Sequence, residues 1–343
     1  MKLVIWTQVV DKHDPLLGFF HDWIKTFAKK FERVDVICFS SGEINLPDNV
    51  KIHTLGKAAG FSKFRQLINF YKHFARLVNN DTDYVLFHMG AIMNILAVPF
   101  YFSKKIKRHR TTYLWWKTHG HINLVGRLAL LFVDRIYTAS KESFPIKTSK
   151  KKVVGHAIDT DLFVDKNEHS EPVILVVGRK MSRKRIEKTL TIASNLKLTG
   201  ENFSMKIIGP DSDSEYLNKL KNIISEQTLE PEVLLLPAMT QIDLNEEYSK
   251  AQLLLNMSDT DSVDKVVLEA MASGVIPVTC TNAFADILSS YKLFFSKDDI
   301  DGMSNRVKEL LHNPTERSTI KGKLRDIVVD KHSLATISNR IFN

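Results

Sequence analysis

A strand, a loop, a helix and a second strand follow one another late in the chain, and this order restricts the fold more than any other stretch. Residues 252–257 and 275–279 are short apolar runs typical of buried strands. Between them, Asp264 can begin a helix as its N-cap, 266–272 supply about two turns, and Gly274 suits the left-handed stop after the helix. Such units normally make a right-handed crossover between parallel strands. We therefore expect an α/β fold with a parallel sheet.

Apolar runs of strand length alternate with helical patterns along the whole chain. Strands are expected at 2–10, 34–39, 50–54, 84–88, 111–116, 135–138, 173–177, 205–208, 233–236, 252–257 and 275–279. Helices are expected at 19–31, 61–78, 91–102, 123–132, 185–198, 216–226, 243–250, 266–272, 301–311, 315–328 and 333–342. The alternation is typical of parallel sheets covered on both faces, and it divides near 155–172. We predict two doubly wound Rossmann-like domains, at 1–160 and 161–328.

Composition and cysteine content are those of an ordinary soluble protein of two domains. The 343 residues are 44% hydrophobic and 25% charged. The apolar start is interrupted by Thr7 and Gln8, so no signal peptide is expected, and no apolar run reaches the roughly 18 residues of a membrane span. Cys38 and Cys280 fall in different halves, which favours reduced thiols and a cytoplasmic location.

Basic residues are concentrated in the first half. Residues 1–160 carry 25 lysines and arginines against 12 acids, a net charge of +13, whereas 161–343 carry 23 against 27, a net charge of −4. The first half is therefore expected to face nucleic acid, an anionic membrane surface or a phosphorylated substrate. Basic residues beside apolar faces at 61–78 and 104–110 suit an anionic membrane, although a solvated basic face is equally compatible. No nucleic-acid motif or row of aromatic platforms is present, so no nucleic acid partner is predicted.

Two acids of the late strand–helix unit, Asp261 and Glu269, are candidates for ligand binding. Seven residues separate them, so they lie about 10 Å or more apart along a helix axis. They are too distant to share a proton, but they suit two parts of one long ligand. Ligands of parallel sheets bind at the carboxyl ends of strands and at helix N-termini, which places the site at 258–266, up to Lys265 and Val266.

A basic loop follows the first strand of the second half. Gly178 permits a turn, and Arg179, Lys180, Arg183 and Lys184 crowd the start of the next helix. Cations there cost the helix roughly 0.3–1 kcal/mol each, but they become favourable around an anion such as a diphosphate. A solvated basic loop is the alternative. The chain lacks both the dinucleotide-binding glycine fingerprint and the P-loop, which argues against dehydrogenases and P-loop nucleotidases.

Two histidines, His88 and His119, stand at predicted strand ends of the first half and would share one rim. Strand-end histidines are more often structural than catalytic, although two on one rim improve the case for function. His119 and His121 have no cysteine nearby and make a poor zinc signature, so no metal site is predicted from them.

In combination and in order, these features resemble the GT-B glycosyltransferases of family 4, which transfer sugars from nucleotide donors with retention of anomeric configuration. Members carry Gly-Arg with a lysine five residues beyond the arginine, and two acids separated by seven residues before Ala-Met-Ala-x-Gly-x-Pro-Val. The matching positions are Gly178, Arg179, Lys184, Asp261, Glu269 and 270–278, and the segments 118–120, 133–140 and 158–163 also look like family segments. The resemblance covers nearly the whole chain.

The resemblance implies the layout and the donor contacts. Two Rossmann-like domains would face each other across a cleft, and the last helix, in 329–343, would cross back to the first domain. Arg179 and Lys184 would neutralise the donor diphosphate, and Glu269 would hold the ribose hydroxyls. The reaction requires charge stabilisation on a departing diphosphate more than it requires a strong base.

The resemblance also implies contacts around the transferred sugar. Asp261 would bind hydroxyls of the donor sugar, and His119 would lie beside that sugar. Gly18 would bring backbone N–H groups close to the donor and the acceptor.

The chain departs from the family pattern beside these residues. Many members have Glu-Gly-Phe-Gly at 261–264, where this chain has Asp-Ser-Val-Asp, and Gly-Gly at 283–284, where it has Ala-Phe. Asp261 is one methylene shorter than glutamate, and we expect Lys265 to compensate as a further phosphate partner. The alternative is a surface lysine paired with Asp264 or Asp261. Asp259-Thr260-Asp261 also matches the metal-binding Asp-x-Asp of GT-A enzymes, but the two-domain layout favours GT-B and metal independence.

The sequence therefore predicts a cytoplasmic, retaining, hexosyltransferase-like enzyme, peripheral on the inner face of the cell membrane. It would move a sugar from a nucleotide-diphosphate sugar to a glycan or lipid-linked acceptor in cell-surface glycan assembly, without metal or other cofactor. The alternatives are a metal-dependent glycosyltransferase using Asp259 and Asp261, a GT-B phosphorylase or epimerase, and a non-catalytic basic binding protein.

Overall fold

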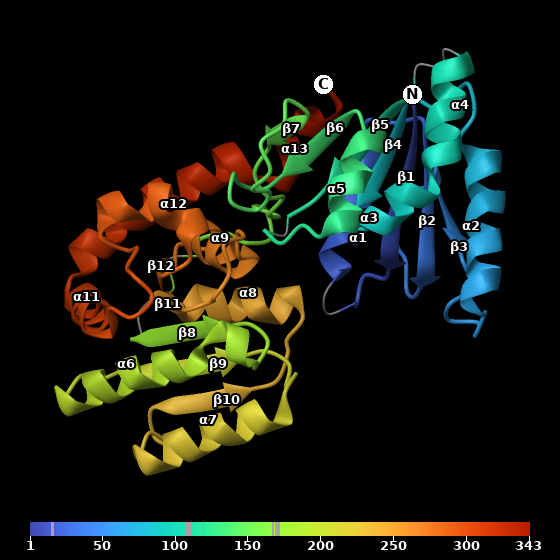
Figure 1. Ribbon diagram of the computed structural model, residues 1–343. Helices are drawn as coiled ribbons and strands as arrows, with labels where there is room; N and C mark the ends of the chain where they lie inside the picture. The colour runs from blue at the N-terminus through green and yellow to red at the C-terminus, as the bar shows by residue number, and fades with distance from the viewer. Residues whose placement is uncertain (15–16, 108–110, 119, 167, 169–171) are drawn as a thin grey trace. The chain divides into compact units, whose positions relative to one another are not determined.

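The chain divides into two compact units. The computed structural model describes residues 1–14, 17–107, 111–118, 120–166, 168 and 172–343. One unit contains 1–155 together with 334–343, and the other contains 156–333 (Figure 1). The boundary lies five residues before the position expected from the sequence, and the last helix belongs to the first unit.

The first unit is built on a parallel sheet of seven strands in the order β3-β2-β1-β4-β5-β6-β7. The strands are β1 (Lys2–Val10), β2 (Arg33–Ser41), β3 (Val50–Thr54), β4 (Tyr84–His88), β5 (Thr112–Trp116), β6 (Arg135–Thr138) and β7 (Lys151–Val153). The short β7, of sequence Lys-Lys-Val, was not predicted because it has no apolar run.

Helices cover both faces of this sheet. They are α1 (Gly18–Ala28), α2 (Lys63–Leu77), α3 (Ala91–Leu96), α4 (Val98–Lys107), α5 (Leu124–Ala129) with the 3-10 turn η1 (Leu130–Phe132), and α13 (Leu334–Phe342). The single helix expected at 91–102 is wrong: the chain breaks at Ala97 and starts again. Pro99 has no N–H to donate, so it is accommodated only in the first turn of a new helix.

The C-terminal helix α13 packs within the first unit. The ring of Phe342 lies 4.8 Å from that of Phe31 and 5.1 Å from that of Phe27, measured between centroids. The hydroxyl of Tyr137 donates to the carbonyl of Ile341 over 2.6 Å. These aromatic contacts bury the apolar face of α13.

The second unit is a parallel sheet of five strands in the order β10-β9-β8-β11-β12. Its strands are β8 (Val173–Val177), β9 (Ser204–Ile208), β10 (Val233–Leu236), β11 (Leu253–Asn256) and β12 (Ile276–Thr279). Its helices are α6 (Ile186–Leu198), α7 (Ser214–Glu226), α8 (Gln241–Lys250), α9 (Lys265–Ala272), α10 (Ala285–Leu288), α11 (Ile300–His312) and α12 (Pro314–His332), with 3-10 turns η2 (Ser182–Lys184), η3 (Asn282–Phe284) and η4 (Ser289–Tyr291). The two parallel-sheet units confirm the predicted α/β fold class.

Strand order identifies where a ligand is expected in the second unit. The chain runs outward from β8 to β9 and β10, then returns to the other side of β8 and continues through β11 and β12. The order therefore reverses between β8 and β11, and ligands of doubly wound sheets bind beyond the carboxyl ends of strands at such a reversal. The loops after β8 and β11 begin at Gly178 and Met257. Within the described part of the chain, no helix has the length and apolar character needed to cross a membrane.

Candidate functional site

Two glycines allow the loop after β8 to approach the end of β9. Gly178 has a φ of +150° and donates its N–H to the carbonyl of Ile208 over 2.9 Å. Gly209 has a φ of +153°, and a Cβ added there would lie 2.0 Å from the carbonyl oxygen of Gly178. On the open side of Gly178, an added Cβ would lie 3.1 Å from Cε of Lys184, so the lysine stem crosses this glycine. The backbone thus determines where Lys184 can run.

The four basic side chains of this loop do not form one cluster. Lys180 is only 2% exposed, and its Nζ donates to the carbonyls of Gly209 over 2.5 Å and Leu236 over 2.7 Å and pairs with Asp211 at 2.9 Å. Lys180 therefore joins loops of the sheet and is unavailable to a ligand, which corrects the prediction. The side chains of Arg179 and Arg183 are exposed and make no hydrogen bond or ion pair with any described residue.

Lys184 is held by Asp264 across the strand reversal. Its Nζ lies 2.6 Å from Oδ2 of Asp264, and the two side chains are 20% and 16% exposed. The same oxygen accepts hydrogen bonds from the hydroxyl of Ser258 over 2.6 Å and from the amide of Asn256 over 2.9 Å. Asp264 does precede α9 as predicted, but its side chain makes no capping hydrogen bond. It serves as the partner of Lys184.

The Asp264 carboxylate is stabilised as an anion. Burial by itself raises the pKa of Asp264, but the charge of Lys184 and the hydrogen bonds from Lys184, Ser258 and Asn256 outweigh burial and lower it. A second layer fixes the donor: Oδ1 of Asn256 accepts hydrogen bonds over 3.0 Å from the hydroxyls of Thr279 and Thr281. The amide of Asn256 therefore has one orientation, with its NH₂ toward Asp264.

Glu269 lies one turn into α9, buried with 5% exposure. Burial raises its pKa, Lys265 opposes this, and Asp264 adds to it, so the pKa is raised overall. Nζ of Lys265 lies 3.8 Å from Oε1 of Glu269, a contact between successive turns. Val266 is half-buried, and its carbonyl accepts a hydrogen bond from Tyr248 over 3.2 Å. The structure thus gathers Lys184, Lys265, Val266 and Glu269 around the N-terminal turns of α9.

The two acids of the Asp-x-Asp sequence have different partners. Asp259 forms an ion pair with Lys297. Asp261 is exposed and accepts a hydrogen bond over 3.2 Å from the amide of Asn282. No group of three His, Cys, Asp or Glu side chains suited to a metal ion occurs among the described residues.

The predicted residues of the first unit differ in outcome. His119 lies outside the described residues. Gly18 is the first residue of α1, and an added Cβ would lie 3.0 Å from the carbonyl of Lys12, so there is little room for a side chain. His88 is 2% exposed, with Nδ1 2.9 Å from the hydroxyl of Thr7 and its ring stacked 3.9 Å from that of Phe20. His88 is therefore buried and held by its neighbours, which fits a structural role better than a catalytic one.

Sequence reasoning missed the network that holds Lys184. Asn256 lies outside the segment 258–266 that the sequence predicts as the site. Ser258 and Asp264 lie within it, but the sequence gives neither a role toward Lys184, because each has an ordinary local role in a loop or before a helix. One signal was present: Asn256 is a polar residue that ends an otherwise apolar strand.

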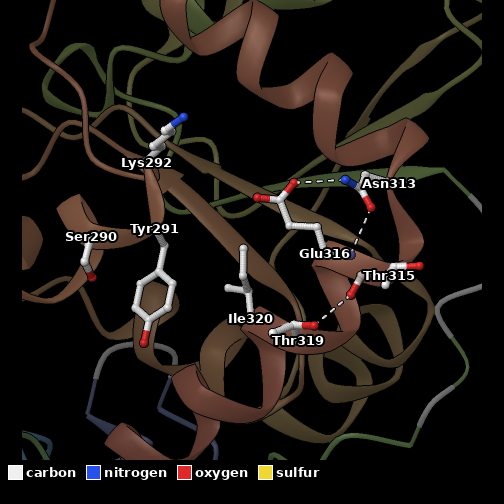
Figure 2. Close-up of a pocket in the computed structure, with 8 residues that line it drawn as sticks. All are labelled: Ser290, Tyr291, Lys292, Asn313, Thr315, Glu316, Thr319 and Ile320. Atoms are coloured by element: carbon white, nitrogen blue, oxygen red, sulfur yellow. Dashed lines mark hydrogen bonds between the residues drawn. The ribbon is translucent and has the colours of Figure 1, made fainter.

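A pocket of about 450 Å³ elsewhere in the second unit contains none of the predicted site residues (Figure 2). Its lining residues are Ser290, Tyr291, Lys292, Asn313, Thr315, Glu316, Thr319 and Ile320. Oδ1 of Asn313 accepts from the backbone N–H of Glu316 over 3.0 Å, and the Glu316 carboxylate pairs with Arg306 at 2.6 Å. These polar groups start helix α12 and join it to α11, so we assign them a structural role.

Known proteins resemble this chain in part of its sequence and in its fold. Residues 158–325 match the family model described as glycosyl transferases, group 1. That segment contains the loops after β8 and β11 and all of α9. The match and the relatives named below support a glycosyltransferase, and the fold is that of the GT-B glycosyltransferases.

Individual relatives are distant in sequence. The O-antigen chain mannosyltransferase RfbU of Salmonella typhimurium is 23% identical over 174 residues, which are 50% of this chain and 48% of that protein, so the match spans about half of this relative. Anabaena HepE in complex with UDP and glucose is similar with a TM-score of 0.77 and 15% identity, covering 99% of this chain and 98% of that one. Sucrose-phosphate synthase from Thermosynechococcus elongatus is similar with a TM-score of 0.76 and 14% identity, covering 99% of this chain and 97% of that one.

Proposed function

We propose that the protein is a retaining glycosyltransferase that moves a sugar from a nucleotide-diphosphate sugar to a glycan or lipid-linked acceptor in cell-surface glycan assembly. The observation that carries the proposal is the charge arrangement at the strand reversal. Arg179 and Lys184 flank the end of β8, and the buried Glu269 lies on α9 just beyond β11. Cations beside a helix N-terminus suit a diphosphate, and a buried carboxylate suits hydroxyl donors.

Each predicted site residue of the second unit has a role in the proposed reaction. Arg179 and Lys184 neutralise the charge that develops on the departing nucleoside diphosphate, and Lys265 adds a further cation at the start of α9. Glu269 accepts hydrogen bonds from the ribose hydroxyls, and Asp261 accepts them from hydroxyls of the donor sugar. Gly178 lets the backbone turn beneath Lys184, and Val266 belongs to the helix turn that faces the phosphates.

On the acceptor side, the proposal assigns two residues of the first unit. Gly18, at the start of α1, brings its backbone close to donor and acceptor. His119 contributes beside the transferred sugar.

The donor is tested by a thermal-shift screen of nucleotide sugars, because a bound donor stabilises by mass action. UDP-glucose and nucleotide-linked mannose come first, since similar proteins are named for UDP and for mannosyl transfer. Product NMR then reports the anomeric configuration, and inversion would contradict the retaining mechanism. A non-catalytic binding protein would release no nucleoside diphosphate. An epimerase would convert the sugar without an acceptor, and a phosphorylase would require phosphate.

Metal independence is a separate part of the proposal. Asp259 and Asp261 are engaged by Lys297 and Asn282, and the cations of the basic loop supply the charge that a metal would otherwise provide. EDTA should leave turnover unchanged. Total loss of turnover, restored by a divalent cation, would support the metal-dependent alternative.

We further propose that the protein works in the cytoplasm, peripherally on the inner face of the cell membrane, where lipid-linked acceptors are found. Helix α2 carries four basic residues and no acid. Phe64 and Ile68 project from it with 72% and 50% exposure. Apolar side chains among cations favour anionic bilayers.

Vesicle sedimentation tests this surface. Vesicles with anionic lipid should bind the protein at low salt, and the double variant with Phe64→Ser and Ile68→Ser should bind them less. The matched control is Leu198→Ser in the second unit, where an 82% exposed leucine lies at the end of α6. Equal binding by the double variant and the control would contradict a role for α2.

A further inference from the structure

The proposed diphosphate site contains an unexpected carboxylate. Asp264 stands immediately before α9, only 2.6 Å from the ammonium group of Lys184. A negative charge there opposes a second anion and, as noted above, does not cap the helix. Its function therefore cannot be to bind the diphosphate directly.

The geometry restrains the position of the lysine. Oδ2 of Asp264 accepts hydrogen bonds from Lys184, Ser258 and Asn256, and Asn256 is itself oriented by two threonine hydroxyls. All of these groups except Lys184 come from β11, β12 and the loops that follow them. A free lysine side chain otherwise loses rotamer entropy when a ligand immobilises it. In this network the lysine is already ordered.

We propose that Asp264 is a positioning residue that holds the Lys184 ammonium at the reversal between β8 and β11. This inference rests on the proposed glycosyl transfer. An ammonium group has three N–H donors; one is directed at Asp264, and two remain for oxygens of the departing diphosphate. Asp264 contacts neither donor nor acceptor. Its contribution is that the cation is in place when charge develops on the leaving group.

The proposal predicts a distinctive kinetic result. Asp264→Asn removes the ion pair but preserves the size of the side chain. The variant changes the affinity for the nucleoside diphosphate in two opposite ways. The less ordered lysine weakens binding, whereas loss of the Asp264 charge, which repels phosphate, strengthens it. We expect kcat to fall by about tenfold, and the Kd for the nucleoside diphosphate to stay within about threefold or to tighten. If Asp264 only stabilised the fold, Asp264→Asn would lower the melting temperature without lowering kcat relative to the Kd.

A double-mutant cycle tests whether Asp264 acts through Lys184. In a Lys184→Ala background, Asp264→Asn should change kcat by less than about twofold, because the group it positions is absent. An equally large fall in both backgrounds would overturn the proposal, as would an unchanged kcat for the single variant. Asp213→Asn is the matched control, since Asp213 precedes α7 and does cap it, accepting from the N–H of Tyr216 over 3.0 Å.

A measurement on the unliganded protein separates this inference from the proposed function. Reductive methylation of Lys184, followed by peptide mass spectrometry, should be several-fold faster in Asp264→Asn and somewhat faster in Ser258→Ala, because the amine is less engaged. Ser258→Ala also covers the case in which Asp264→Asn does not fold. Unchanged methylation in both would overturn the positioning role. If methylation becomes faster but no sugar donor is turned over, the proposed function is wrong, whereas the inference that Asp264 positions Lys184 still stands.

Discussion

Gly209→Ala should be the most destabilising glycine substitution in the second unit. The new Cβ would lie 2.0 Å from the carbonyl oxygen and 2.6 Å from the carbonyl carbon of Gly178. These are backbone atoms, and Gly178 is fixed by its own hydrogen bond to Ile208. Relief therefore requires the loop after β8 to move away from β9, and that loop carries Lys184.

Two costs combine in Gly209→Ala. A φ of +153° in a residue with a side chain costs about 1–3 kcal/mol. Displacing a packed backbone costs about 1–3 kcal/mol more. For a unit of this size, each kcal/mol lowers the melting temperature by about 2–4 °C, so the expected fall is about 4 °C or more. The assay is thermal unfolding followed by circular dichroism.

Two other glycines provide matched controls for Gly209→Ala. Gly200 has a φ of +73° but nothing within 4 Å of an added Cβ, so Gly200→Ala isolates the backbone cost of about 1–2 kcal/mol. Gly322 lies exposed within α12, also with open space, and Gly322→Ala should stabilise by about 0.5–1 kcal/mol. A melting temperature for Gly209→Ala equal to or above that of Gly200→Ala would refute the steric reasoning.

Three further predictions concern single side chains. Lys180→Met should lower the free energy of unfolding by about 2 kcal/mol or more in urea titration, because two buried carbonyls lose their donor. Arg179→Met should change the free energy of unfolding by less than about 0.5 kcal/mol. It should instead weaken nucleotide binding, measured by calorimetry. Phe342→Ala should destabilise the first unit by about 3–5 kcal/mol in urea, and wild-type stability would contradict the packing of α13. For buried Asp35, burial raises the pKa, but hydrogen bonds from His53 and a neighbouring arginine outweigh it and lower the pKa. The resulting stabilisation is present above the unfolded pKa of about 3.9 and is lost as pH falls through the lower folded value. Asp35→Asn should therefore show a shallower loss of stability as the pH falls below about 4, measured by urea unfolding at each pH.

Most strands could be predicted because apolar composition determines them. In a parallel sheet covered on both faces, strands are nearly continuous apolar runs, and those at 84–88, 135–138 and 233–236 have the expected bounds. Helix ends were harder to predict. The helix expected from residue 185 begins at Ile186, because Arg185 takes a φ of +49°, a conformation that the sequence does not signal.

The candidate site could be predicted only where its chemistry is local. Gly178, Lys184 and Glu269 stand at fixed spacings next to a strand or within one helix, so the sequence was sufficient to predict where they lie in the fold. Lys180 was grouped with the other cations because its neighbours in sequence are basic. Its actual partners, Gly209 and Leu236, lie on other strand ends, and only the packed sheet brings them to its ammonium group.

Asp264 shows how a tertiary partner can outweigh a local preference. An aspartate before a helix is worth roughly 0.5–2 kcal/mol as a cap, and nothing in the sequence opposes that reading. A hydrogen bond between charged groups contributes about 1.5–3 kcal/mol, and Asp264 also gains hydrogen bonds from Ser258 and Asn256. The side chain therefore turns away from α9 toward Lys184, 80 residues earlier in the chain. A glycine at 264 would leave this lysine without its carboxylate partner, and the cycle of Lys184 and Asp264 variants measures what the pair contributes.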